Sequence, residues 1–182
     1  MPYLSIIRSF PAFFALITFV MLASCGGPGP QQQDAVPQDD GLLMLLERQV
    51  LTNILAERRI AGIRTTMLEE NDALKATARA HSLDMATRNY FSHVNPEGQG
   101  PLERHRKRVT FVQGKIGENI WSSELVPGQD PNLSALARRS VSGWMGSPDH
   151  RDLILDQRMT LVGVGAAFTD QWVYVTLLMQ GP

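Results

Sequence analysis

The chain has 182 residues, with 17 Lys and Arg against 18 Asp and Glu, a single Cys and 43% hydrophobic residues. This length and composition predict one globular domain with an appendage, and they exclude a disordered chain or a collagen. The balanced charge argues against general nucleic-acid binding, which depends on an excess of cations that contact phosphates. Because one Cys cannot form an intrachain disulfide, packing alone must stabilise the core.

An apolar run near the start of the chain, residues 10–23, follows the positive charge of Arg8. The run is shorter than the roughly 20 residues of a membrane-spanning helix, and its flanks are typical of a secretory signal peptide. The tetrapeptide Leu22-Ala23-Ser24-Cys25 resembles the lipobox of bacterial lipoproteins. That resemblance implies a signal peptide over 1–24 and lipidation of Cys25. The alternative is that Cys25 is a small buried residue of an uncleaved anchor. The Gly-, Pro- and Gln-rich residues 25–40 predict a flexible tether.

Two helices are predicted in the first half of the remaining chain. Apolar residues recur at steps of three and four from residue 41 to about Arg59, which predicts an amphipathic helix that Gly62 can end. A second helix is predicted over 72–88, and it places His81 on its buried face beside Leu74, Ala78 and Met85. The loop that follows contains His93, a position where a rigid element would hold a group open to ligand.

The second half predicts a helix followed by strands. Asp130 is predicted as the N-cap of a third helix, with Pro131 at its first position and Ser147-Pro148 at its end. The apolar segments 161–168 and 172–179 predict an antiparallel hairpin, and residues 116–121 a third strand. The predicted fold class is therefore α+β, with a small antiparallel sheet flanked by helices.

Five motifs occur in one order along the chain: Ala80 to Ala86, Tyr90-Phe91-Ser92-His93, Gly117-Glu118-Asn119-Ile120, Trp144 to Arg151, and Val162-Gly163-Val164-Gly165. In this combination the sequence resembles the CAP superfamily of cysteine-rich secretory, antigen 5 and pathogenesis-related proteins, and more closely its bacterial SCP-like extracellular branch. The resemblance covers residues 42–181, and we assign a CAP/SCP-like domain to 41–182. It implies an α-β-α sandwich with a cleft that binds zinc or another divalent metal in some relatives.

The resemblance implies specific cleft residues. The two family histidines fall on His93 and His150, and the acidic residue of the strand falls on Glu118. A Glu of many eukaryotic relatives is replaced here by Ser147, with Asp149 nearby as the other candidate for the cleft. His93, Glu118 and His150 together would form a three-ligand metal shell, which for zinc leaves a fourth position for water. The alternative is a hydrogen-bonded polar network that orders the cleft.

Other residues receive structural interpretations. His81 is expected to be a satisfied core histidine, while Gly163 and Gly165 are expected to permit close backbone contact. The basic run Arg104 to Arg108 is expected to be a solvated loop, and its alternative role is contact with lipid head groups or an anionic envelope polymer.

Signatures of common enzymes are absent from the sequence, including His-Glu-x-x-His, Gly-x-Ser-x-Gly and the phosphate loop. From the lipobox-like sequence and the family resemblance, we expect a lipoprotein of the bacterial cell envelope, anchored to the membrane through Cys25 and facing the periplasm or the exterior. Its expected function is to bind a small lipidic or glycan-like ligand, with or without a divalent metal. The alternatives are a metal-dependent peptidase or esterase that uses His93, Glu118 and His150, and a module that presents a surface to a partner protein.

Overall fold

The computed structural model describes residues 39–182, so the predicted signal peptide, Cys25 and nearly all of the predicted tether lie outside the described residues. The helices of the described part are α1 (Asp40–Ile60), α2 (Asp72–Arg88), α3 (Pro101–Arg106), α4 (Leu133–Met145) and α5 (Pro148–Leu155), with a short 3₁₀ turn at Thr65–Met67. The strands are β1 (Glu69–Glu70), β2 (Lys115–Glu124), β3 (Leu161–Phe168) and β4 (Trp172–Gly181). None of these helices is both long and apolar enough to cross a membrane.

The strands form one sheet in the order β1-β3-β4-β2. The predicted hairpin is confirmed, since β3 and β4 pair antiparallel, and the predicted third strand is confirmed by the antiparallel pairing of β2 with β4. The sheet also contains β1, which pairs parallel with β3 and was not predicted. A strand of two residues is too short to show a period-two pattern. The predicted α+β fold class is confirmed, with a mixed sheet.

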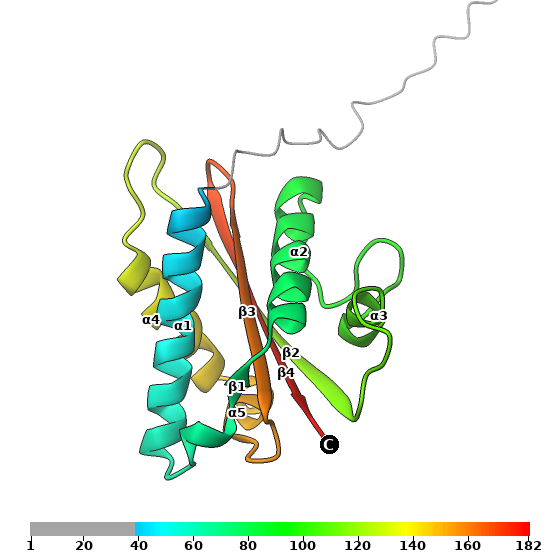
Figure 1. The fold of residues 1–182 in the computed structure, drawn as a ribbon. Helices are drawn as coiled ribbons and strands as arrows, with labels where there is room; N and C mark the ends of the chain where they lie inside the picture. The colour runs from blue at the N-terminus through cyan, green and yellow to red at the C-terminus, as the bar shows by residue number, and fades with distance from the viewer. Residues whose placement is uncertain (1–38) are drawn as a thin grey trace, which may run out of the picture. The chain divides into compact units, whose positions relative to one another are not determined.

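Helices cover both faces of this sheet (Figure 1). On one face, Val173, Val175 and Leu177 of β4 belong to the main apolar core, which also contains buried residues of α1, α4 and α5. On the other face, Leu178 of β4 packs with Leu74 of α2. Strands that are buried on both faces need apolar residues at successive positions, which explains the nearly continuous apolar character of β3 and β4.

Two glycines bring α2 against the sheet. A Cβ atom on Gly165 would lie 2.0 Å from the backbone nitrogen of Arg79, and one on Gly163 would lie 2.3 Å from that of Lys75. These distances are far below any normal contact, so only glycine allows the helix to lie this close to β3. The expected role of these two glycines is confirmed.

The predicted boundaries hold for α2 and fail for α4. The second helix runs over the predicted residues, and its predicted buried residue His81 is 1% exposed. The prediction that Asp130 is the N-cap of α4 is wrong. Asn132 is the N-cap, and its side chain accepts a hydrogen bond from the backbone nitrogen of Ala135 at 3.0 Å. Asn, Asp and a following Pro are all favourable near a helix start, so local preference did not distinguish between the two positions.

The prediction that the basic run is a solvated loop is wrong. Its first three residues, Arg104 to Arg106, belong to α3. Arg104 is 9% exposed and His105 is 3% exposed, whereas Arg106, Lys107 and Arg108 are exposed. A run of five consecutive polar residues, four Arg or Lys and one His, has no apolar periodicity, and therefore the sequence did not indicate a buried face. A further unpredicted helix, α5, begins at Pro148, directly after the predicted end of the preceding helix.

Candidate functional site

Glu118 is the centre of a buried polar cluster on the α2 side of the sheet. It lies in the middle of the edge strand β2, and its side chain is 1% exposed. Oε1 of its carboxylate lies 2.9 Å from Nδ1 of His93, and Oε2 lies 2.5 Å from Nη2 of Arg104. Both oxygens of this carboxylate therefore have partners, which come from the loop after α2 and from α3.

His93 is held on one side by Glu118 and is open on the other. Its imidazole is 47% exposed although its partner carboxylate is buried. Because an ionised carboxylate only accepts hydrogen bonds, the contact at Nδ1 places the imidazole proton on that nitrogen. In the neutral ring Nε2 is then an acceptor. An imidazole oriented in this way can accept a hydrogen bond from a ligand hydroxyl, take up a proton or bind a metal.

Arg104 holds this arrangement together. Its Nη1 donates to the carbonyl of His93 at 2.7 Å and to the carbonyl of Gln99 at 2.8 Å, while its Nη2 donates to Glu118. One guanidinium thus joins β2 to both ends of the loop that carries His93. Arg104 was not predicted to belong to the site, because it lies in a basic run that was expected to be a solvated loop.

His81 lies behind the carboxylate, within the core. Its Nε2 is 3.1 Å from the carbonyl oxygen of Ser92 and 3.8 Å from Oε1 of Glu118. Burial lowers the pKa of His81 below its ordinary value, despite the nearby carboxylate of Glu118. The neutral ring then donates from Nε2 to Ser92. The prediction of a buried, hydrogen-bonded core histidine is confirmed.

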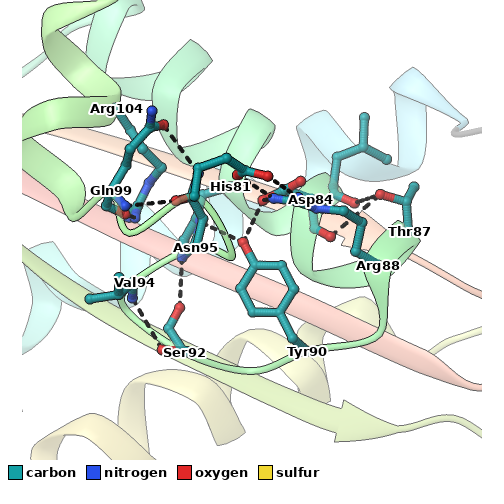
Figure 2. Close-up of polar contacts among 12 residues, drawn as sticks. His81, Asp84, Thr87, Arg88, Tyr90, Ser92, Val94, Asn95, Gln99 and Arg104 are labelled. Carbon is teal, nitrogen blue, oxygen red and sulfur yellow. Dashed lines mark hydrogen bonds and ion pairs between the residues drawn. The ribbon is translucent and has the colours of Figure 1, made fainter. Parts of the chain in front are cut away.

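A second polar network ties the His93 loop to the end of α2 (Figure 2). The hydroxyl of Tyr90 donates to Oδ2 of Asp84 at 2.5 Å, and Arg88 binds the same oxygen at 2.7 Å. Arg88 also pairs with both carboxylate oxygens of Glu97. Burial and the bond to Asp84 raise the pKa of Tyr90, so its hydroxyl remains a donor. The sequence analysis did not identify this network, because its residues are all common surface types.

His150, Ser147 and Asp149 lie at the start of α5. Asn119 donates from Nδ2 to the carbonyl oxygen of His150 at 3.0 Å, which attaches α5 to β2. Neighbouring residues of a strand point to opposite faces, so Asn119 reaches α5 on one side while Glu118 reaches α2 and α3 on the other. Ser147 is half-buried and Asp149 is exposed. Within residues 39–182 no hydrogen bond or ion pair joins these three side chains to His93 or Glu118.

The donor set does not fit the expected three-ligand metal shell as it is arranged here. Among the described residues, no group of three or more His, Cys, Asp or Glu side chains could hold a metal ion. Each oxygen of Glu118 already accepts a hydrogen bond, one from Arg104 and one from His93, so a cation bound there would share the carboxylate with the Arg104 guanidinium. The metal site and its three residues stay a prediction.

Comparison with known proteins agrees with this fold. The model of the CAP family, the cysteine-rich secretory protein family, matches residues 56–180. The uncharacterized protein YkwD of Bacillus subtilis (strain 168) is 32% identical over 119 residues, which are 65% of this chain and 41% of that protein. The chain therefore spans less than half the length of this relative.

Two solved structures have the same fold. An extracellular protein of Bacillus anthracis str. Ames that contains an SCP domain aligns with a TM-score of 0.62 and 22% identity, covering 82% of this chain and 45% of that one. An outer surface protein of Borrelia burgdorferi aligns with a TM-score of 0.59 and 19% identity, covering 75% of this chain and 93% of that one. Because the family model matches most of the described residues, this chain belongs to the CAP, or cysteine-rich secretory protein, family.

Proposed function

We propose that this protein is a binding module of the bacterial cell envelope, tethered through Cys25, that holds a hydrophilic, glycan-like ligand at His93. One observation carries the proposal: the His93 imidazole is 47% exposed while a buried, ion-paired carboxylate orients it at 2.9 Å. Because the orientation of this exposed ring is already fixed, it can accept a hydrogen bond from a ligand at a small cost in conformational entropy.

The segment around His93 has the composition that a sugar ring requires. Phe91 is 52% exposed and Val94 is 50% exposed, so apolar surface lies on both sides of the imidazole along the chain. Pyranose rings present hydroxyl groups at their edges and apolar C–H groups on their faces. Binding sites for small molecules combine these two kinds of surface, with few polar groups placed to orient the ligand. This composition favours a glycan over the lipidic ligand that the sequence also allowed.

The binding experiment uses the full chain in mild detergent, with N-acetylglucosamine oligomers as the probe and titration calorimetry as the readout. We expect saturable binding that weakens at least tenfold in His93→Ala and is unchanged in the control Thr110→Ala, an exposed residue outside the site. Vesicles of phosphatidylglycerol and of phosphatidylcholine form the second arm. Binding to vesicles without binding to the oligomers, or no binding in either arm, would contradict the proposal.

The tether is tested separately from the ligand. The lipobox-like sequence before Cys25 supports a lipid anchor, and anchoring by two or more acyl chains is strong because each buried CH₂ contributes about 0.8 kcal/mol. We expect the protein to partition into detergent in phase-separation experiments and Cys25→Ser to leave it unprocessed, without the mass increase of the acyl chains. Mass spectrometry of the mature N-terminus checks both the cleavage and the modification.

A metal-dependent hydrolase is the alternative function. It would require Glu118 to bind a cation beside Arg104 and His93, with His150 brought to the same ion. This function predicts stoichiometric metal in elemental analysis, activity that a chelator removes, and equal loss in His93→Ala and His150→Ala. The binding module predicts a larger effect of His93→Ala, because His93 contacts the Glu118 carboxylate and, among the described residues, His150 does not.

A further inference from the structure

A cavity of about 440 Å³ lies between α2, the loop over residues 95–99 and the end of α3. Small-molecule sites commonly have volumes of about 300 to 1,000 Å³, so this cavity can hold a compact ligand. Arg104 and His81 belong to its wall, whereas His93, Glu118 and His150 do not. The cavity is therefore separate from the His93 site, and Arg104 and His81 lie between the two.

The two acidic groups of the cavity wall share one arginine, which offsets one of their two negative charges. Asp84 and Glu97 both line the cavity, and both are paired with Arg88, which lines it too. Glu97 has a lowered pKa, chiefly because of its hydrogen bonds to Arg88. Each carboxylate is hydrogen-bonded to this guanidinium, so a negatively charged ligand entering the cavity would meet paired rather than free acids.

The two cations at the other side of the cavity, Lys107 and Arg108, form no direct ion pair with an acidic side chain of the described residues, although Lys107 lies near enough to Glu97 to help lower the pKa of that carboxyl. Lys107 donates one hydrogen bond, to Oε1 of Gln99 at 2.6 Å, and so keeps two of its three N–H groups. The guanidinium of Arg108 makes no hydrogen bond or ion pair within residues 39–182. Both side chains line the cavity and both residues are exposed, so a ligand can reach them from solvent.

Two arginines that line the cavity also have unused donor capacity. Arg88 and Arg104 each keep a buried Nε–H without a hydrogen-bond partner in the described part of the chain. A buried donor without a partner is costly, and such groups are rare in native proteins unless a ligand or water binds there. Two of them occur among the residues that line this one cavity.

We propose that this cavity binds the phosphate group of a small hydrophilic phosphomonoester. A phosphomonoester carries a charge of about −1.5 to −2 at pH 7, which matches the two unpaired cations, Lys107 and Arg108. A carboxylate would neutralise only one of them. The planar guanidinium of Arg108 can contact two phosphate oxygens at once, and Lys107 can contact the third. The polar amides of Asn95 and Gln99 in the wall suit a ligand whose remainder carries hydroxyl groups.

The test measures binding of glucose 6-phosphate to the full chain by titration calorimetry at low salt. Inorganic phosphate, unphosphorylated glucose and phosphatidylglycerol vesicles form the other arms. The variant is Lys107→Gln with Arg108→Gln, which removes two exposed cations. The charge-matched control is Arg48→Gln with Arg138→Gln, two exposed cations on α1 and α4.

We expect saturable binding of glucose 6-phosphate that weakens at least tenfold in the cavity variant and by less than twofold in the control, with no binding of glucose. Saturable binding of inorganic phosphate with the same dependence on the two residues supports the same site and assigns its affinity to the phosphate alone. The proposal is overturned if neither phosphate compound binds, if both double variants lose affinity equally, or if only vesicles bind. Binding of glycan oligomers at His93 should survive the cavity variant, so the two sites fail or succeed independently.

Discussion

Arg104 and Glu118 form an ion pair of 2.5 Å in which the arginine side chain is 9% exposed and the glutamate side chain 1% exposed. The pair connects α3 with the edge strand β2, and the same guanidinium holds the carbonyl of His93. Water is nearly excluded from both partners, so removal of either one would leave the other as a buried charge without a counter-charge. The position of the exposed His93 ring thus follows from a buried charge pair behind it.

Replacing Glu118 should therefore destabilise the fold. In Glu118→Gln the guanidinium of Arg104 loses its counter-charge while it stays buried, and removal of one partner of such a pair costs about 3–5 kcal/mol. Urea denaturation followed by circular dichroism measures the free energy of unfolding. Glu124→Gln is the control, because Glu124 is an exposed residue on the same strand and should change stability by less than about 0.5 kcal/mol. Equal effects of the two substitutions would show that the pair contributes nothing.

A methyl group on Gly165 should force α2 away from the sheet. The added Cβ would lie 2.0 Å from the Arg79 backbone nitrogen, and backbone cannot yield as a flexible side chain can. We expect Gly165→Ala to cost at least about 1–3 kcal/mol, the usual effect of overpacking. The matched control is Gly143→Ala in α4, where the nearest atom lies at 3.5 Å. That change should stabilise the helix by up to about 1 kcal/mol, since alanine is the better helix former. Thermal unfolding compares the two, and a stable Gly165→Ala protein would contradict the packing described here.

The two buried histidines should make the fold less stable in acid. Burial lowers the pKa of both His81 and His105 below the ordinary value of 6.5. Below pH 6.5 the unfolded chain binds protons at these positions before the native protein does, so the free energy of unfolding falls as the pH decreases from 6.5 towards the native pKa values. Above this window both states are neutral and the contribution is constant.

The comparison of the native sequence with His105→Gln isolates this effect from that of the carboxylates. Glutamine can still bond to the Thr77 hydroxyl, which lies 3.0 Å from Nδ1 of His105. Urea denaturation at pH 7.5, 6.5 and 5.5 should show a smaller loss of stability for the variant between the last two values. Parallel curves over the whole range would mean that His105 does not contribute to the acid sensitivity.

Asn119 should control the attachment of α5, and with it the position of His150. Asn119→Ala removes the 3.0 Å hydrogen bond to the His150 carbonyl and leaves that acceptor without its partner, at a cost of about 1–3 kcal/mol. We expect faster hydrogen exchange over residues 148–155 and unchanged exchange in α2. Ser122→Ala on the same strand is the control, because no side-chain hydrogen bond of Ser122 occurs in the described residues. Exchange that rises equally in both helices would indicate global unfolding instead of local release.

Several elements could be predicted because their signals are local. The spacing of Leu74, Ala78 and Met85 determines the buried face of α2, and the two apolar segments on either side of residues 169–171 determine the hairpin. Boundaries were less certain where two caps compete, as Asp130 and Asn132 do. The two-residue strand β1 and the short helix α3 are formed by their tertiary partners and have no periodic pattern of their own.

The sequence by itself determined helix α2, the hairpin of β3 and β4, and the order of the family motifs, and it made His93 and Glu118 candidates for the site, because these depend on residue types and on spacing along the chain. Only the tertiary structure decided that Arg104, 14 residues before Glu118, neutralises this carboxylate, and that His93, 25 residues before it, binds the other oxygen. It also decided that the backbone carbonyl of His150 accepts a hydrogen bond from Asn119, the residue that follows Glu118. The physical reason is that the packing of β2 against α3 determines which partner lies beside a buried charge, and no local sequence pattern encodes that packing.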